Sequence, residues 1–113
     1  MKIFITGVAG FLGSHLADQM LAEGHTVVGN DNMIGGYADN VPQEVEFHQI
    51  DCCDLENLTK AMQDCDIVYH TAATAYEGLS VVSPVLVTKN IFEASVTTIT
   101  AAIRNKVKRF VYC

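Results

Sequence analysis

Basic residues are scarce in this chain, and their scarcity narrows the kinds of partner it can have. The 113 residues include 7 Lys and Arg against 13 Asp and Glu, a formal net charge of −6 at pH 7. An acidic balance argues against nucleic acid or an anionic membrane as the main partner. Four basic residues gather near the end of the chain, a cluster typical of a solvated helix end: Arg104, Lys106, Lys108 and Arg109. We therefore expect no nucleic-acid and no membrane partner.

Cysteine motifs and long apolar segments are missing as well. The four cysteines, Cys52, Cys53, Cys65 and Cys113, form no C-x-x-C pair and show no metal-ligand spacing, so no metal site is predicted. Unpaired cysteines are typical of a reducing compartment, and we expect a cytoplasmic protein. No run of about 20 apolar residues occurs, so no membrane span is expected. The first apolar run, residues 2–6, is too short for the core of a signal peptide.

Strand-like and helix-like segments alternate along the whole chain, without internal repeats. Apolar and β-branched runs predict five strands, at residues 2–6, 26–30, 45–50, 66–70 and 110–112. Helical spacing of apolar residues predicts three helices, at 11–23, 55–63 and 84–104, with loops at 31–42 and 71–83. The alternation predicts a single α/β domain over residues 1–113. Its sheet is expected to be a Rossmann-type doubly wound parallel sheet, truncated after about five strands, in the order 3-2-1-4-5.

Local signals mark the expected helix ends. Gly24 follows the first helix and is a stop signal. Asp54 can cap the second helix with its carboxylate. Ser83 followed by Pro84 predicts the start of the third helix, with a cap and a first-turn proline.

The strongest functional signal is a glycine-rich turn between the first strand and the first helix. Gly7, Gly10 and Gly13 form the pattern G-x-x-G-x-x-G. In such a turn the first glycine permits the tight bend, the second lets the backbone approach a pyrophosphate, and the third lets the helix pack on the sheet. The helix N-terminus then offers free N–H groups and a partial positive charge to phosphates. The placement predicts a dinucleotide site.

Asp31 supplies the second signal, at the end of the second strand. A carboxylate there can accept hydrogen bonds from the adenosine ribose hydroxyls. It would also repel a 2′-phosphate, and no Arg or Lys stands between Lys2 and Lys60 to attract one. The sequence therefore predicts NAD in preference to NADP.

Several short motifs occur in the order seen in one enzyme family. They are residues 6–13 (TGVAGFLG), Asp31-Asn32 with Gly35-Gly36, Asp51-Cys52-Cys53-Asp54, His70-Thr71-Ala72-Ala73, Asn90, and residues 107–113. Together they resemble the extended short-chain dehydrogenases/reductases, of the nucleotide-sugar epimerase and dehydratase kind. The resemblance spans the whole chain and implies NAD as the cofactor and a nucleotide-linked sugar as the substrate.

The resemblance also implies a set of cofactor-binding residues. Asp51 would meet the adenine amino group, Cys52 would contribute its backbone and apolar side chain, and Ala72 and Ala73 would line the nicotinamide side. The complete implied set is Gly7, Gly10, Phe11, Leu12, Gly13, Asp31, Asn32, Asp51, Cys52, Thr71, Ala72, Ala73 and Asn90.

Four of the residues in these motifs also have a structural interpretation, which needs no contact with a ligand. Asp51 could be a strand-end turn residue, and we favour a helix cap for Asp54. His70 is interpreted as a packed, hydrogen-bonded histidine, not a catalyst. Asn90, inside a helix, is either a buried polar anchor or a contact to the cofactor, and the sequence leaves both open.

The family's catalytic residues have no counterpart here. The resemblance implies a Ser or Thr after the fifth strand and a Tyr-x-x-x-Lys helix, and no tyrosine of this chain has a lysine four places on. We therefore expect no catalytic residue in residues 1–113, no substrate-binding region, and a longer parent enzyme that forms a homodimer. The alternatives are a non-catalytic NAD-binding regulatory module and the front half of another reductase of this superfamily. A flavodoxin-like or phosphate-binding domain is disfavoured by Asp31 and the H-x-A-A segment.

Overall fold

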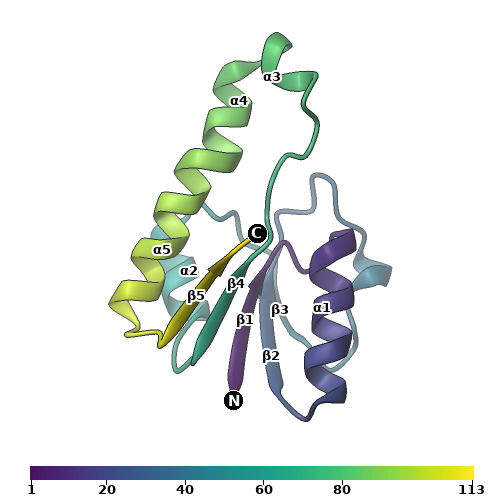
Figure 1. Cartoon of the computed structure of the whole chain (residues 1–113), viewed down its shortest axis with the longest axis vertical. Coiled ribbons are helices and arrows are strands. Elements are labelled where there is room, and N and C mark those ends of the chain that lie inside the picture. The colour runs from purple at the N-terminus through teal and green to yellow at the C-terminus, as the bar shows by residue number, and fades with distance from the viewer.

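Five parallel strands form the centre of the computed structural model, which describes residues 1–113 (Figure 1). They are β1 (Lys2–Thr6), β2 (Thr26–Asn30), β3 (Glu46–His48), β4 (Ile67–His70) and β5 (Arg109–Tyr112). The sheet order is β3-β2-β1-β4-β5, which confirms the predicted fold class and strand order. β1 is central, with four of its five residues buried, whereas β3 is the edge strand that its alternating sequence predicts.

Helices cover both faces of the sheet (Figure 1). On one face, α1 (Phe11–Ala22) packs Ala17 and Met20 against Ile3 and Ile5 of β1. On the other face, α2 (Leu55–Ala61) and α5 (Ala94–Arg104) enclose a second cluster: Phe4, Val28, Leu58, Ala61, Met62, Cys65, Val68, Ala101 and Ala102. Each large apolar side chain buried in these clusters contributes roughly 1.5–3 kcal/mol. This two-sided core holds the carboxyl ends of the strands together at one edge of the sheet.

Two of the predicted helix-end signals behave as expected. Gly24 adopts a φ of 85° directly after the end of α1, a conformation that costs glycine little. The Asp54 carboxylate caps α2 by accepting a hydrogen bond from the Asn57 amide at 3.2 Å. Ser83 precedes Pro84 at the start of α4 (Pro84–Thr88), but its hydroxyl makes no capping hydrogen bond, so that part of the prediction is wrong.

The prediction of one continuous α-helix over residues 84–104 is wrong. After α4 the helix widens into a π-helical segment, η2 (Lys89–Glu93), before α5 continues it. A short helix, α3 (Leu79–Val82), and a 3₁₀ turn, η1 (Ala38–Asn40), occur in stretches predicted as loops. Apolar periodicity does not distinguish i→i+4 from i→i+5 hydrogen bonding, which explains the missed π segment.

The helical arm formed by α3, α4 and η2 extends beyond the edge of the sheet (Figure 1). None of its residues is buried. Large apolar side chains are exposed along it, among them Val81, Val82 and Val85, each at least 80% exposed. The arm therefore has no buried core of its own and is held by its continuity with α5 and by hydrogen bonds at η2.

Candidate functional site

One cleft of about 560 Å³ lies at the carboxyl ends of the strands. Of the 21 residues that line it, 13 are the residues predicted from the sequence: Gly7, Gly10, Phe11, Leu12, Gly13, Asp31, Asn32, Asp51, Cys52, Thr71, Ala72, Ala73 and Asn90. Ligands of open parallel α/β sheets bind outside the carboxyl ends of the strands. The fold thus brings residues from the whole length of the chain to the place where such a ligand is expected.

Two of the three glycines in the turn leave no space for a side chain. Gly7 has a φ of 68°, and a Cβ there would lie 2.8 Å from the Ala72 Cα. A Cβ on Gly13 would overlap the Gly7 carbonyl oxygen and approach the Val8 Cα to 2.9 Å. At Gly10 a Cβ would meet only the Gly7 oxygen, at 3.2 Å. Gly7 and Gly13 are therefore required by packing, whereas Gly10 is left open toward the cleft.

The start of α1 suits an anionic group. Gly10 is the N-terminal flanking residue of α1 and has extended backbone, with no side chain to cap the helix. The amides of Phe11 and Leu12, in the first turn, have no intrahelical acceptor and lie at the cleft. Unpaired first-turn amides and the positive end of the helix dipole favour a phosphate here.

Asp31 is held against the glycine turn. Its Oδ2 accepts a hydrogen bond from the Ala9 amide at 3.1 Å, and its Oδ1 accepts one from the Met33 amide at 2.8 Å. Gly36 lies directly beside it, because a Cβ on Gly36 would come within 3.1 Å of Asp31 Oδ2. The carboxylate is thus fixed in orientation and lines the cleft at the end of β2.

Asn32 and Asp51 connect the segments that follow β2 and β3. Asn32 Nδ2 donates to Asp51 Oδ2 at 3.2 Å, and the Cys53 amide donates to Asp51 Oδ1 at 2.8 Å. Partial burial raises the pKa of Asp51, but these hydrogen bonds, together with the nearby Cys53 side chain and the charge of Lys89, hold the pKa below its ordinary value. Asp51 is therefore a charged acceptor at the cleft.

Thr6 organises the opposite side of the cleft. Its hydroxyl oxygen accepts hydrogen bonds from the amides of Thr71 and Ala72, both at 3.1 Å. The same oxygen lies 2.8 Å from His70 Nδ1. Because two amides already occupy its lone pairs, the Thr6 hydrogen points to Nδ1, which places the ring proton of His70 on Nε2. The small residues after β4 are thereby held close to Gly7.

His70 is buried beneath this side of the cleft. Only 1% of its surface is exposed, and Nε2 donates to Ser95 Oγ of α5 at 3.0 Å. Burial lowers its pKa to about 4. The structure supports the interpretation of His70 as a packed, hydrogen-bonded residue, because it joins β1 and β4 to α5 and does not line the cleft.

The depressed pKa of His70 predicts a pH dependence of stability. Its pKa is about 4 in the folded state and 6.5 as the reference value, so the unfolded chain binds the proton more readily. The contribution of His70 is complete above pH 6.5 and is lost as the pH falls toward 4, by about 3 kcal/mol at most. Urea unfolding between pH 7 and pH 4 measures it. The unfolding free energy of a His70→Gln variant should change less steeply with pH than that of the wild type. Equal slopes in the two proteins would contradict a depressed pKa for His70.

Asn90 reaches the cleft from the π-helical segment. Its Nδ2 donates to Thr74 Oγ1 at 2.9 Å, which joins η2 to the loop after β4. The structure places Asn90 both at this anchor and among the cleft-lining residues. Asn90 is partly exposed, so it is a polar anchor but not a buried one, and its contact with the cofactor stays a prediction.

Eight lining residues were not predicted: Asn30, Ile34, Gly35, Gly36, Thr74, Ala75, Tyr76 and Ala94. Asn30 immediately precedes Asp31 at the end of β2, so the strand-end rule could have included it. Its amide is buried, with Nδ2 donating to the Ile50 carbonyl at 2.8 Å and Oδ1 left without a partner. Thr74 and Tyr76 lie in a loop with no periodic signal, and only the folded chain places them.

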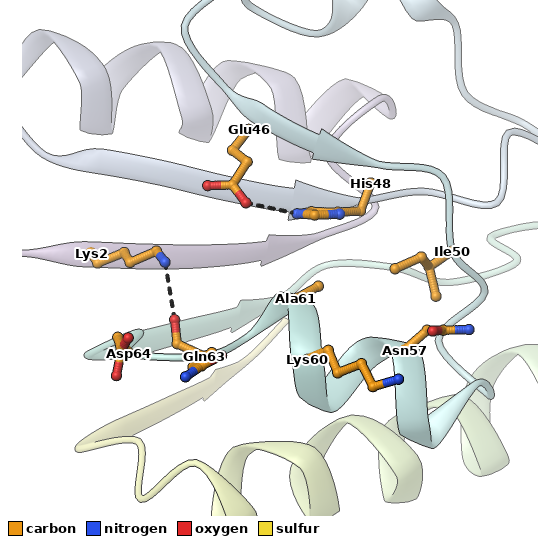
Figure 2. Close-up of a pocket in the computed structure, with 9 residues that line it drawn as sticks. All are labelled: Lys2, Glu46, His48, Ile50, Asn57, Lys60, Ala61, Gln63 and Asp64. Atoms are coloured by element: carbon orange, nitrogen blue, oxygen red, sulfur yellow. Dashed lines mark hydrogen bonds and ion pairs between the residues drawn. The ribbon is translucent and has the colours of Figure 1, made fainter.

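A second hollow, of about 400 Å³, lies between β3 and α2 (Figure 2). Three of its polar side chains have partners within the hollow: His48 Nε2 lies 3.0 Å from Glu46 Oε1, and Lys2 Nζ donates to the Gln63 carbonyl at 3.0 Å. No buried polar atom in it lacks a partner. We therefore place the functional site in the first cleft.

No group of three or more His, Cys, Asp or Glu is arranged to hold a metal ion. No helix is long and apolar enough to cross a membrane. All four cysteines are free thiols.

Known proteins match this chain over its full length. The sequence pattern of the "NAD dependent epimerase/dehydratase family" matches residues 3–113. A UDP-glucose 4-epimerase of Caenorhabditis elegans is 31% identical over 129 residues, covering 99% of this chain and 37% of the enzyme. A probable UDP-arabinose 4-epimerase of Arabidopsis thaliana is also 31% identical, covering 97% of this chain and 29% of that protein.

Solved structures of UDP-glucose 4-epimerases also match this chain over nearly its whole length. The Thermotoga maritima UDP-glucose 4-epimerase with UDP-glucose superposes with a TM-score of 0.96 at 30% identity, over 99% of this chain and 37% of that one. The Thermus thermophilus UDP-glucose 4-epimerase in complex with NAD superposes with a TM-score of 0.92 at 33% identity. This match covers 97% of this chain and 36% of that one. The chain thus spans little more than a third of the length of these enzymes.

Proposed function

Because this chain belongs to the NAD-dependent epimerase/dehydratase family, we propose that it is the cofactor-holding part of an enzyme that 4-epimerises UDP-linked sugars. One observation carries the proposal: the cleft gathers the glycine turn, Asp31 and the segments after β3 and β4 at one edge of the sheet. Similarity to UDP-sugar 4-epimerases over nearly the whole chain supports the substrate class. When bound, NAD supplies a reversible hydride acceptor.

The cleft is suited to NAD along its length. The start of α1 and Gly10 would receive the pyrophosphate, and the fixed carboxylate of Asp31 would accept the adenosine ribose hydroxyls. Asp51, a charged acceptor, would face the adenine amino group. Thr71, Ala72, Ala73 and Asn90 would border the nicotinamide side, where small residues leave room for the ring.

The chemistry of the sugar is proposed to require residues beyond this segment. In the family that the motifs resemble, a Ser or Thr after the fifth strand and a Tyr-x-x-x-Lys helix carry it. Residues 1–113 contain no Tyr-x-x-x-Lys. The proposed role of this segment is therefore to bind and orient the cofactor, with the sugar nucleotide bound mainly by the remainder of the enzyme.

The test uses the intact protein. We expect NADH to bind, and UDP-glucose and UDP-galactose to interconvert without net change in the amount of NAD, as followed by chromatography of the sugar nucleotides. Binding of NADH without interconversion of any UDP-sugar would contradict the substrate class and favour a regulatory module or another reductase. Absence of NADH binding would overturn the proposal altogether.

A homodimer is proposed to form along the exposed side of the helical arm and α5. Exposed apolar residues recur with alternating spacings of four and three, at Phe92, Val96, Ile99 and Ile103. This seven-residue repeat suits packing against a second helix. A second copy of the same helix is the proposed partner, and a monomeric mass of the intact protein in sedimentation would contradict it.

The free thiols support a cytoplasmic location.

A further inference from the structure

The π-helical segment η2 receives one hydrogen bond from a side chain outside its own helix. A π turn rearranges the backbone hydrogen bonds, and here the Ala94 amide donates to the carbonyls of both Lys89 and Ile91. The same two carbonyls also accept side-chain donors: Lys89 O from the Cys53 thiol, at 3.5 Å, and Ile91 O from the Ser95 hydroxyl four residues on in the helix. Asn90 lies between these two anchored positions and is the residue of η2 that reaches the cleft.

One donor is local and the other is distant: Ser95 lies four residues after Ile91, whereas Cys53 lies 36 residues before Lys89. Ser95 belongs to α5 and is itself held by His70. Cys53 belongs to the turn before α2, where its amide donates to Asp51 at 2.8 Å. The backbone of Cys53 thus fixes a carboxylate at the cleft, while its side chain fixes the π turn. Cys53 therefore joins the Asp51 side of the cleft to η2.

The Cys53 thiol is a hydrogen-bond donor at neutral pH. Burial and the neighbouring Asp51 carboxylate raise its pKa to about 11. A protonated thiol donates to a carbonyl, whereas a thiolate would be repelled by it. Its low acidity also makes it a poor nucleophile, so its contacts suit a structural task better than a chemical one.

We propose that Cys53 is a positioning residue for the cofactor: its thiol, by donating to the Lys89 carbonyl, fixes the π turn so that Asn90 is held at the cleft. Without this bond the Lys89 carbonyl keeps only the Ala94 amide as donor, and η2 loses its hydrogen bond to the segment after β3. Asn90, the next residue, is then held less firmly at the cleft. The proposal rests on the proposed NAD binding, and Cys53 itself makes no contact with the cofactor.

The test is a double-mutant cycle in the intact protein. Cys53→Ala should weaken NADH binding by about fivefold, the effect of one hydrogen bond, whereas Cys53→Ser, which keeps a donor, should stay within about twofold of wild type. In an Asn90→Ala background, Cys53→Ala should not weaken NADH binding further, because Cys53 is proposed to affect the cofactor only through Asn90. Fluorescence titration of NADH measures all four variants and the parent protein.

An independent readout does not involve the cofactor. The side-chain amide NMR signal of Asn90 should move in apo Cys53→Ala and stay in place in apo Cys53→Ser. An unmoved signal, or a Cys53→Ala effect that persists undiminished in the Asn90→Ala background, would overturn the proposal. Failure of wild-type protein to bind NADH would instead overturn the proposed function, and the NMR comparison would still decide the role of Cys53.

Discussion

Replacing Gly10 by valine should reduce NADH affinity by about 100-fold or more, equivalent to roughly 2.7 kcal/mol, while the protein stays folded. The backbone of Gly10 is extended, with φ −83° and ψ 175°, which any residue can adopt. Its Cβ would meet only the Gly7 oxygen, at 3.2 Å, so a small local shift accommodates it. The branched side chain would then project into the place proposed for the pyrophosphate and block close approach of the phosphates to the backbone.

Gly13→Val is the matched comparison, because it adds the same side chain three residues away. There a Cβ would lie 2.8 Å from the Gly7 carbonyl carbon and 2.9 Å from the Val8 Cα. Both are backbone atoms that cannot move without separating α1 from the sheet. We expect a loss of about 3 kcal/mol or more in unfolding free energy.

Thermal unfolding and NADH titration together distinguish the two glycines. Gly10→Val should keep its melting temperature within a few degrees and lose binding, whereas Gly13→Val should lose both. NADH affinity retained in a folded Gly10→Val protein would place the pyrophosphate elsewhere in the cleft.

The contrast between the two glycines also shows where sequence reasoning was sufficient. Spacing and context predicted three separate roles, and the structure supplies the reason for two of them: a positive φ at Gly7 and backbone contact at Gly13. Strand order was predictable as well, since alternating segments and right-handed crossovers leave few topologies. The cleft-lining residues predicted from strand ends and motifs all lie together.

Features that depend on pairs of distant residues were not predictable. The π turn accepts a hydrogen bond from Cys53, 36 residues before Lys89, and no local pattern encodes that contact. The unpartnered Oδ1 of Asn30 and the placement of Tyr76 likewise result from tertiary packing. Local periodicity identifies elements, whereas such contacts exist only once the elements are assembled.

Replacing Asp31 by arginine should shift the ratio of NADPH to NADH affinity by about 100-fold toward NADPH. None of the residues that line the cleft is Lys or Arg, and two of them, Asp31 and Asp51, are acidic. A 2′-phosphate would therefore meet a fixed carboxylate and no cation in the wild-type protein. Arginine removes the repulsion and offers a planar donor that matches a phosphate.

The substitution also has a structural cost, which a second variant separates from the change in preference. Asp31→Arg leaves the Ala9 and Met33 amides without their acceptor, and Ala9 is fully buried, so stability should fall by about 1–3 kcal/mol. Asp31→Asn keeps an acceptor oxygen and the shape of the side chain but removes the charge. Its affinity for NADPH should rise toward that for NADH without exceeding it.

Titration of both dinucleotides against the wild type and the two variants, at low ionic strength where charge effects are least screened, gives six affinities to compare. If repulsion by the carboxylate sets the preference, Asp31→Asn narrows the gap and Asp31→Arg reverses it. If the ratio of the two affinities is the same in all three proteins, Asp31 does not face the ribose. The carboxylate would then serve only to brace the glycine turn through Ala9, and the preference for NAD would have to arise from the shape of the loop that follows β2.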